Sequence, residues 1–233
     1  MSSTSPAPAA PVSRALTDGP LVTEGPGLLV MDVDSTLIEQ EVIELIAERA
    51  GTREQVAEVT ARAMRGELDF AASLRERVAT LAGVRESVFA NVLAEVRPTR
   101  GAAELIEALH ARGFRVGVVS GGFEEVVVPL AERLGIDHVA ANRLETDNGV
   151  LTGRVLGRIV DRQEKVRCLR TWAERDGVPM ERTIAVGDGA NDLGMLAAAG
   201  LGVAFCAKPV VVEQADAAVH VRDLRAVLQL IQS

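Results

Sequence analysis

The sequence predicts an α/β fold with a doubly wound, mostly parallel sheet, Rossmann-like in its core, and an inserted helical segment. Three observations indicate this fold. Short apolar runs alternate with helical patterns along most of the chain, which is typical of βαβ units. Three of the runs end in, or lead directly into, acidic, serine or glycine residues. A stretch of about 60 residues after the first run carries only helical patterns.

The expected strands are short and rich in branched apolar residues, which suits strands that are buried on both faces. They are Leu28–Asp32, Phe114–Ser120, Thr183–Asp188, Gly200–Cys206 and a short Val219–Val221. The intervening helices are expected at Ala102–Arg112, Glu124–Leu134, Gln163–Glu174, Leu193–Ala199 and Leu224–Ile231. Within Leu144–Val160, stretches of alternating apolar and polar residues flank Asn148-Gly149. This pair favours a tight hairpin turn, so the segment predicts a small antiparallel flap.

Residues 39–96 are expected to form four short helices over the sheet. The expected caps are Gly51, Gly66 and Gly83 at C-termini, Asp69 at an N-terminus, and Thr52 with Gln55 as a capping box. Because ligands of open α/β sheets bind beyond the carboxyl ends of the strands, this insert is well placed to act as a lid. The expected parts are a disordered tail (1–24), an α/β core (25–38 and 97–233) and a helical cap (39–96).

Composition excludes several classes of protein. The chain has 233 residues, is 48% hydrophobic and carries a formal net charge of −8, which argues against general nucleic-acid or anionic-membrane binding. No apolar run is long enough to cross a membrane. Two cysteines, Cys168 and Cys206, make no disulfide framework, so a cytoplasmic protein is expected. A monomer or a homodimer is also expected. Only Lys165 and Lys208 of the 25 basic residues are lysine.

Chemically suggestive residues follow three of the expected strands. Asp32 and Asp34 follow the first, Ser120-Gly121-Gly122 ends the second, and Asp188 and Asp192 follow the third. Up to four carboxylates at one sheet edge are costly without a cation, and oxygen ligands suit Mg²⁺. With Lys165 as a point charge, the set fits phosphoryl transfer through an aspartyl phosphate. Each motif alone has a plainer interpretation as a turn, a helix cap or a calcium loop; their joint occurrence in this order favours function.

These motifs resemble those of the haloacid-dehalogenase-like (HAD) hydrolases. The motifs that carry the resemblance are DVDST, SGGF, Lys165 and GDGANDLGML. The chain is closer still to the phosphoserine phosphatases of that superfamily, from about Leu28 to the C-terminus. The segments that match them are MDVDSTLIEQE, MRGELDF with SLRERV, VVSGGF, ANRL, VGDGANDLGML and AFCAKP.

The resemblance implies a catalytic role for each acidic residue. Asp32 would be the nucleophile that becomes phosphorylated. Asp34 would protonate the leaving seryl oxygen and then activate water. Mg²⁺ would be held by Asp32, Asp188 and the backbone carbonyl of Asp34, with Asp192 supporting these ligands.

The resemblance also implies the binding residues. Ser120, Gly121 and Lys165 would hold the phosphoryl oxygens, and Asn191 would help to place the phosphate. In the cap, Glu41 would receive the substrate ammonium and Arg77 its carboxylate, while Met64 and Phe70 would close the pocket and exclude water.

Helical geometry supports the role of Arg77 independently. Phe70, Leu74, Arg77 and Leu81 share one narrow helix face, and a guanidinium on an apolar face needs a partner. A ligand carboxylate would provide one. Without the resemblance, an arginine that snorkels or pairs with an internal acid is an equally good interpretation.

The expected function is therefore Mg²⁺-dependent hydrolysis of O-phospho-L-serine to serine and phosphate, the final step of serine biosynthesis. The alternative is a HAD phosphatase or phosphotransferase acting on another small phosphorylated amino acid or metabolite. A dehalogenase is disfavoured because that branch lacks an acid at the place of Asp34. A non-catalytic scaffold is disfavoured because the motif residues are all present.

Overall fold

The computed structural model describes residues 19–23 and 25–231, with the side chain of Met64 excepted. The expected disordered tail, 1–24, thus lies mostly outside the described residues. Its described part is anchored: Leu21 is buried, and the Arg182 guanidinium donates to the hydroxyl of Thr23 at 3.0 Å.

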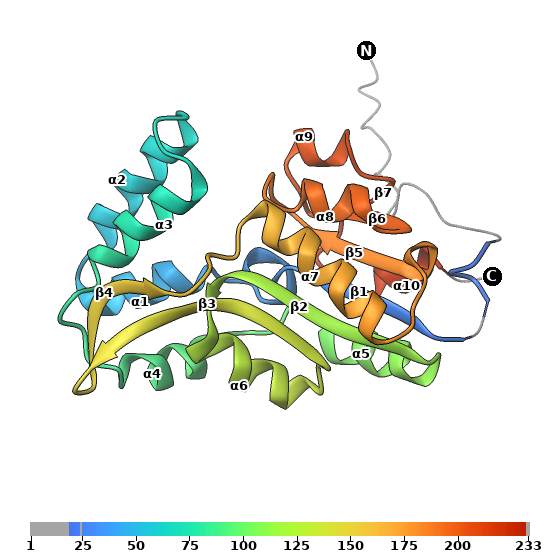
Figure 1. Ribbon diagram of the computed structural model, residues 1–233, viewed down its shortest axis with the longest axis horizontal. Coiled ribbons are helices and arrows are strands. Elements are labelled where there is room, and N and C mark those ends of the chain that lie inside the picture. The colour runs from blue at the N-terminus through green and yellow to red at the C-terminus, as the bar shows by residue number, and fades with distance from the viewer. Residues whose placement is uncertain (1–18, 24, 232–233) are drawn as a thin grey trace, which may run out of the picture.

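One mixed sheet organises the described part of the chain (Figure 1). Its strands are β1 (Gly27–Met31), β2 (Phe114–Phe123), β3 (His138–Asp147), β4 (Val150–Leu156), β5 (Thr183–Gly187), β6 (Leu201–Phe205) and β7 (Ala217–Val219). Their order is β4-β3-β2-β1-β5-β6-β7. All neighbouring pairs are parallel except β3 with β4. The doubly wound fold predicted from the sequence is confirmed.

Most helices lie in the positions that the alternation predicts, but the sequence predicts no helix at Pro209–Val212. They are α1 (Val42–Ala50), α2 (Arg53–Met64), α3 (Phe70–Ala79), α4 (Val88–Glu95), α5 (Ala102–Ala111), α6 (Glu124–Leu134), α7 (Arg162–Arg175), α8 (Leu193–Ala198), α9 (Pro209–Val212) and α10 (Ala226–Gln229). Short helical turns also occupy Val33–Leu37 and Met180–Arg182. None of the described helices is long and apolar enough to span a membrane.

Both faces of the sheet are buried at its centre, as β1 shows. Leu28 and Val30 pack into the core beneath α7 and α8, whereas Leu29 and Met31 pack into the larger core with α5 and α6. In Figure 1, α7 lies on one side of the strands, while α5 and α6 lie on the other. Two-sided burial explains why β1 is a continuous apolar run rather than an alternating one.

Three strand assignments differ from the sequence prediction. Strand β2 continues past Ser120 to Phe123 through an irregular register. The short last strand is Ala217–Val219 instead of Val219–Val221, because Ala217 and Val219 pair with β6. The sequence predicts no element for residues 138–143, but they begin β3, which pairs in parallel with β2.

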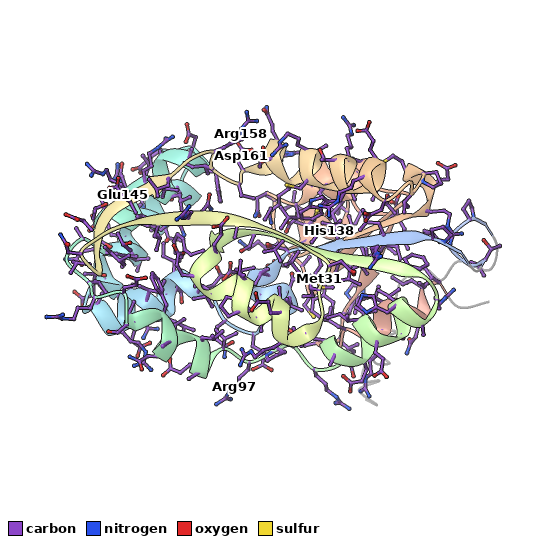
Figure 2. The ribbon with its side chains drawn as sticks, turned by 60° about the horizontal axis from the view of Figure 1, so that its bottom comes forward. Met31, Arg97, His138, Glu145, Arg158 and Asp161 are labelled. Atoms are coloured by element: carbon purple, nitrogen blue, oxygen red, sulfur yellow. The ribbon has the colours of Figure 1, made fainter. Side chains whose placement is uncertain are left out.

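The predicted hairpin is present, but its strands β3 and β4 belong to the main sheet and do not form a separate flap. Asn148 and Gly149 both have positive φ, at 49° and 76°, as a type I′ turn requires. Figure 2 shows His138 and Glu145 near opposite ends of the long strand β3. The hairpin also pairs with the segment between α3 and α4, where the Gly83 N–H donates to the Leu151 carbonyl at 2.9 Å. Gly83 is therefore a turn residue in this contact, not the predicted C-cap.

The other predicted caps have mixed outcomes. Gly51 ends α1 in the left-handed conformation, and Gly66 follows α2 in the same conformation. The Asp69 carboxylate accepts from the Ala72 N–H at 2.7 Å, as an N-cap does. The Thr52–Gln55 capping box is wrong, because the Thr52 hydroxyl is buried without a hydrogen-bond partner in the described residues.

Candidate active site

The carboxyl ends of β1, β2 and β5 lie side by side, because these strands are neighbours and parallel. Asp32 follows β1, and its N–H donates to the Val186 carbonyl of β5 at 3.0 Å. Ser120 lies in β2, and Asp188 follows β5. The three motifs predicted to converge are therefore brought to one edge of the sheet.

Lys165 joins two of the carboxylates. Helix α7 places its ammonium 2.7 Å from Oδ1 of Asp32 and 2.7 Å from Oδ1 of Asp192, with the side chain wholly buried. Burial by itself lowers the pKa of Lys165, but the charges of Asp192 and Asp32 outweigh it and raise that pKa above its usual value. The lysine is therefore a fixed cation at physiological pH.

Asp192 is fully engaged by the protein. Its Oδ1 faces Lys165, and its Oδ2 accepts from the Gly189 N–H at 3.0 Å. A carboxylate held in this way fixes the lysine and the loop after β5. That position fits the supporting role expected for Asp192.

Three carboxylates form a cluster that could hold a metal ion. One oxygen from each of Asp32, Asp188 and Asp192 lies within 4.8 Å of the others. Burial, followed by the charge of Asp192, raises the pKa of both Asp32 and Asp188. Apart from the Lys165 ion pair, Oδ1 of Asp32 has no hydrogen-bond partner in the described residues. One ammonium balances only part of this charge, so the donor set fits a divalent cation.

Asp34 is held in a different environment from Asp32. The chain turns sharply after β1, with Ser35 in the left-handed conformation at φ 56°. The Asp34 carboxylate accepts from the Val42 N–H at 2.7 Å and from the Ser120 hydroxyl at 3.1 Å. Burial raises the pKa of Asp34 in spite of these hydrogen bonds. Two adjacent carboxyls thus have separate surroundings, which is the pattern of separate acid–base roles.

The glycines after Ser120 leave room for close contacts. A Cβ atom at Gly121 would lie 2.9 Å from the Phe70 ring, and one at Gly122 would lie 2.9 Å from the Asp34 carboxylate. The Ser120 hydroxyl accepts from the Gly122 N–H at 2.8 Å. Asn142 fixes this segment, since its side-chain amide donates to the Gly121 carbonyl at 2.8 Å.

Glu41 lies just before α1 and faces the same space. Its Oε1 accepts from the Ser35 hydroxyl at 2.7 Å. The residue is open to solvent on one side, but burial of its carboxylate and the charge of Asp34 raise its pKa to about 7. A carboxyl with this pKa changes charge within the physiological range.

Arg77 lies on α3 and is half-buried. Burial lowers its pKa, while Glu41 and Asp34 oppose that shift. Its Nε donates a long hydrogen bond of 3.4 Å to the Ser73 carbonyl. Among the described residues it forms no ion pair within 4.0 Å. The interpretation that it pairs with an internal acid is therefore not supported.

A cavity of about 560 Å³ lies between helices α1–α3 and the strand ends. The predicted site residues that line it are Asp32, Asp34, Glu41, Phe70, Arg77, Gly121, Asp188 and Asn191. Ser120, Lys165 and Asp192 are fully buried behind this lining. The side chain of Met64 lies outside the described part of the structure.

Several residues of this region are not among the site residues expected from the sequence. Thr36 donates from its hydroxyl to Oδ1 of Asp188 at 3.3 Å, and its place in the DVDST run was the available signal. For Asn142, the only available signal was its membership of the ANRL segment. Arg162 and Lys208 also line the cavity.

The comparisons with known families agree with this fold and site. The haloacid dehalogenase-like hydrolase family matches residues 29–197, a range that contains the three strand-end motifs and Lys165. The chain therefore belongs to the haloacid dehalogenase-like hydrolases.

Curated relatives narrow the family further. A phosphoserine phosphatase of Streptococcus thermophilus is 53% identical over 210 residues, which are 90% of this chain and 98% of the relative. One from Streptomyces coelicolor is 61% identical over 88% of this chain, but this match covers only half of the longer relative. Within the hydrolase family the chain belongs to the phosphoserine phosphatase branch.

Solved structures give the same result. A substrate-bound phosphoserine phosphatase complex aligns with a TM-score of 0.84 at 42% identity, covering 90% of this chain and all of the other. A phospho-aspartyl intermediate analogue of phosphoserine phosphatase aligns with a TM-score of 0.83 at 44% identity, covering 88% of this chain and 99% of the other.

Proposed function

We propose that this chain is a Mg²⁺-dependent phosphatase that hydrolyses O-phospho-L-serine to L-serine and phosphate through an aspartyl phosphate, as the last step of serine formation. The observation that carries this proposal is the carboxylate of Asp32. It lines the cavity, is paired with a buried ammonium, and stands two residues from a second carboxyl with different partners.

In the first step, the Asp32 carboxylate attacks phosphorus, and the bond from phosphorus to the seryl oxygen breaks. Asp34 donates its proton to that oxygen, which leaves as the serine hydroxyl. Burial raises the pKa of Asp34, which favours the protonated form that a general acid needs.

In the second step, Asp34 acts as a base. Its carboxylate takes a proton from water, the water oxygen attacks the aspartyl phosphate, and the bond from phosphorus to the Asp32 oxygen breaks. Phosphate leaves, and both carboxyls return to their starting states. The hydrogen bonds from Val42 and Ser120 hold Asp34 in one orientation throughout.

Mg²⁺ would be held by Asp32, Asp188 and the carbonyl of Asp34, and it would supply positive charge against the phosphoryl oxygens. Asp192 is already occupied by Lys165 and Gly189, so it would support the site through these contacts. Lys165, Ser120, the Gly121 amide and Asn191 would hold the phosphoryl group.

The amino-acid head of the substrate would be recognised by cap residues. Glu41 would bind the ammonium, and Arg77 would bind the carboxylate through its planar fork of donors. The absence of an ion pair for Arg77 in the described residues supports this, because a half-buried guanidinium is stabilised when a ligand carboxylate arrives. A substrate without this head would leave both groups unpaired.

Residues 39–96 would act as the cap over the α/β core of 25–38 and 97–233. The support is the contact of Phe70 with Gly121, which joins α3 to the strand-end loop. Phe70, together with Met64, would exclude water from the reacting groups.

Phosphate release from phosphoserine in the presence of Mg²⁺ tests the proposal. Phosphothreonine, phosphohomoserine and a plain alkyl phosphate form the comparison panel, with and without an acceptor alcohol. We expect phosphoserine to have the highest kcat/KM, with water as the acceptor. Equal activity on the alkyl phosphate would refute the substrate, and preferred transfer to the alcohol would indicate a phosphotransferase.

A further inference from the structure

Two cationic side chains line the cavity without belonging to the set expected from the sequence. Arg162 is the first residue of α7, and Lys208 directly precedes α9. Both residues are exposed, and both line the cavity that contains Asp32 and Arg77. Neither charged tip has an ion pair or a hydrogen-bond partner among the described residues.

The backbones that carry these side chains are fixed. The Lys208 carbonyl accepts from the N–H groups of Val211 and Val212 at 2.9 and 3.1 Å. The stem of Arg162 lies across α8, where a Cβ at Gly194 would be 3.1 Å from Cγ of Arg162. Each cation is therefore held at the cavity wall by rigid local structure, although its tip is free.

Their places in the fold put them next to the expected phosphoryl site. Arg162 precedes Lys165 by three residues on α7, so the two lie on neighbouring turns of one helix face. Lys208 follows the carboxyl end of β6, which pairs with β5, the strand that leads to Asp188. Both residues line the same cavity as Asp32, the partner of Lys165.

The cavity carries negative charge that Arg162 and Lys208 partly offset. Four carboxylates line it, from Asp32, Asp34, Glu41 and Asp188, on a chain of net charge −8. A phosphate ester dianion is repelled by such a surface unless local cations offset it. Arg77 lies on the cap side, so Arg162 and Lys208 supply the cationic charge at the wall formed by the core.

We propose that Arg162 and Lys208 form a phosphate-capturing rim, which draws the phosphate ester dianion into the cavity and binds orthophosphate as it leaves. This inference rests on the proposed phosphatase function. It assigns the two residues to capture and release of the anion, outside the bond-breaking steps. They therefore act on KM and on product affinity, with little effect on kcat.

The test uses Arg162→Met and Lys208→Met, which keep the side-chain stems and remove the charges. Arg170→Met is the matched control, because Arg170 is exposed on the same helix and does not line the cavity. Lys208→Arg tests whether charge alone suffices. The readouts are kcat, KM and the inhibition constant of orthophosphate on the full chain with Mg²⁺, at about 20 mM and about 500 mM salt.

At low salt we expect each Met variant to lose roughly two- to fivefold in kcat/KM and to bind orthophosphate correspondingly more weakly. We expect kcat to stay within about twofold, Lys208→Arg to match the wild type, and the differences to shrink at high salt because ions screen exposed charges. Wild-type values and salt dependence in both Met variants would overturn the inference. A loss confined to kcat with unchanged salt dependence would also overturn it, since that indicates a structural effect.

The outcome is separable from that of the proposed function. If the wild type prefers another phosphate ester, the substrate proposal fails, and the variants are compared on that ester with the same expectations. If the wild type hydrolyses no phosphate ester, the binding of orthophosphate to the wild type and to the two Met variants, measured by calorimetry, tests the role of the rim. Equal affinities would then refute it.

Discussion

The ammonium of Lys165 lies 2.7 Å from Oδ1 of Asp32, and neither group is reached by much solvent. This pair places a compact fixed cation against the proposed nucleophile. In a chain that uses arginine for nearly all its positive charges, the choice of lysine fits a site too narrow for a planar guanidinium.

Removal of this cation should destabilise the fold as well as the reaction. Lys165→Met leaves Asp32 and Asp192 buried without their partner, and such a loss costs about 3–5 kcal/mol. Chemical denaturation without metal measures this cost. Lys165→Arg is the comparison, and we expect it not to restore activity. Unchanged unfolding free energy in Lys165→Met would contradict the inferred importance of the pair.

Replacement of Arg77 should act on substrates that have an α-carboxylate. Loss of a charged bidentate contact of about 1.5–3 kcal/mol raises KM roughly 10- to 100-fold. We therefore expect Arg77→Ala to raise KM for phosphoserine by that factor, with little effect on an alkyl phosphate. Arg75→Ala on the same helix is the control, because Arg75 is exposed and does not line the cavity. Equal effects on both substrates would indicate that Arg77 only packs.

Protonation of Glu41 should make substrate selectivity depend on pH. Burial and the charge of Asp34 raise its pKa to about 7, so the carboxylate becomes neutral as the pH falls through that value. Binding of an ammonium needs the ionised form. We expect kcat/KM for phosphoserine to fall below about pH 7 more steeply than kcat/KM for an alkyl phosphate. Glu41→Gln should remove this difference between the profiles, and parallel wild-type profiles would contradict the role of Glu41.

Metal binding should stabilise the folded chain. One oxygen from each of Asp32, Asp188 and Asp192 lies within 4.8 Å of the others, and burial and the charge of Asp192 raise the pKa of Asp188 and Asp32. A cation bound among these carboxylates would favour their ionised forms. We expect added Mg²⁺ to raise the thermal midpoint of the wild type by several degrees, and EDTA to abolish activity reversibly. Asp188→Asn should reduce the thermal shift. A midpoint insensitive to Mg²⁺ at millimolar concentrations would argue against the site.

Most of the sheet and the motif positions could be predicted from sequence. The buried runs such as Leu28–Asp32 have a composition that fits strands covered on both faces, and the parallel order then brings their ends together. The first residues of β3 could not be predicted in the same way. His138–Asn142 is short, and its pairing with β2 comes from tertiary contact.

The errors have a common physical origin in tertiary structure. Thr52 and Gln55 match a capping pattern, but the Thr52 N–H donates to the Ala47 carbonyl and its hydroxyl stays unpaired in the described residues. Gly83 matches a C-cap, but the hairpin pairs with its backbone. Lys208 has only its membership of the AFCAKP segment as a signal, because the packing of β6 beside β5 is what carries it to the cavity.

The nucleophilic role of Asp32 is tested most directly by trapping the phosphorylated enzyme. The chain with Mg²⁺ is mixed with phosphoserine, quenched in acid within milliseconds, digested and analysed by mass spectrometry. We expect a phosphate adduct on Asp32 in the wild type, and none in Asp32→Asn, which should also lose more than about a thousandfold in kcat. Wild-type turnover in Asp32→Asn, or an adduct on another residue, would contradict covalent catalysis by Asp32.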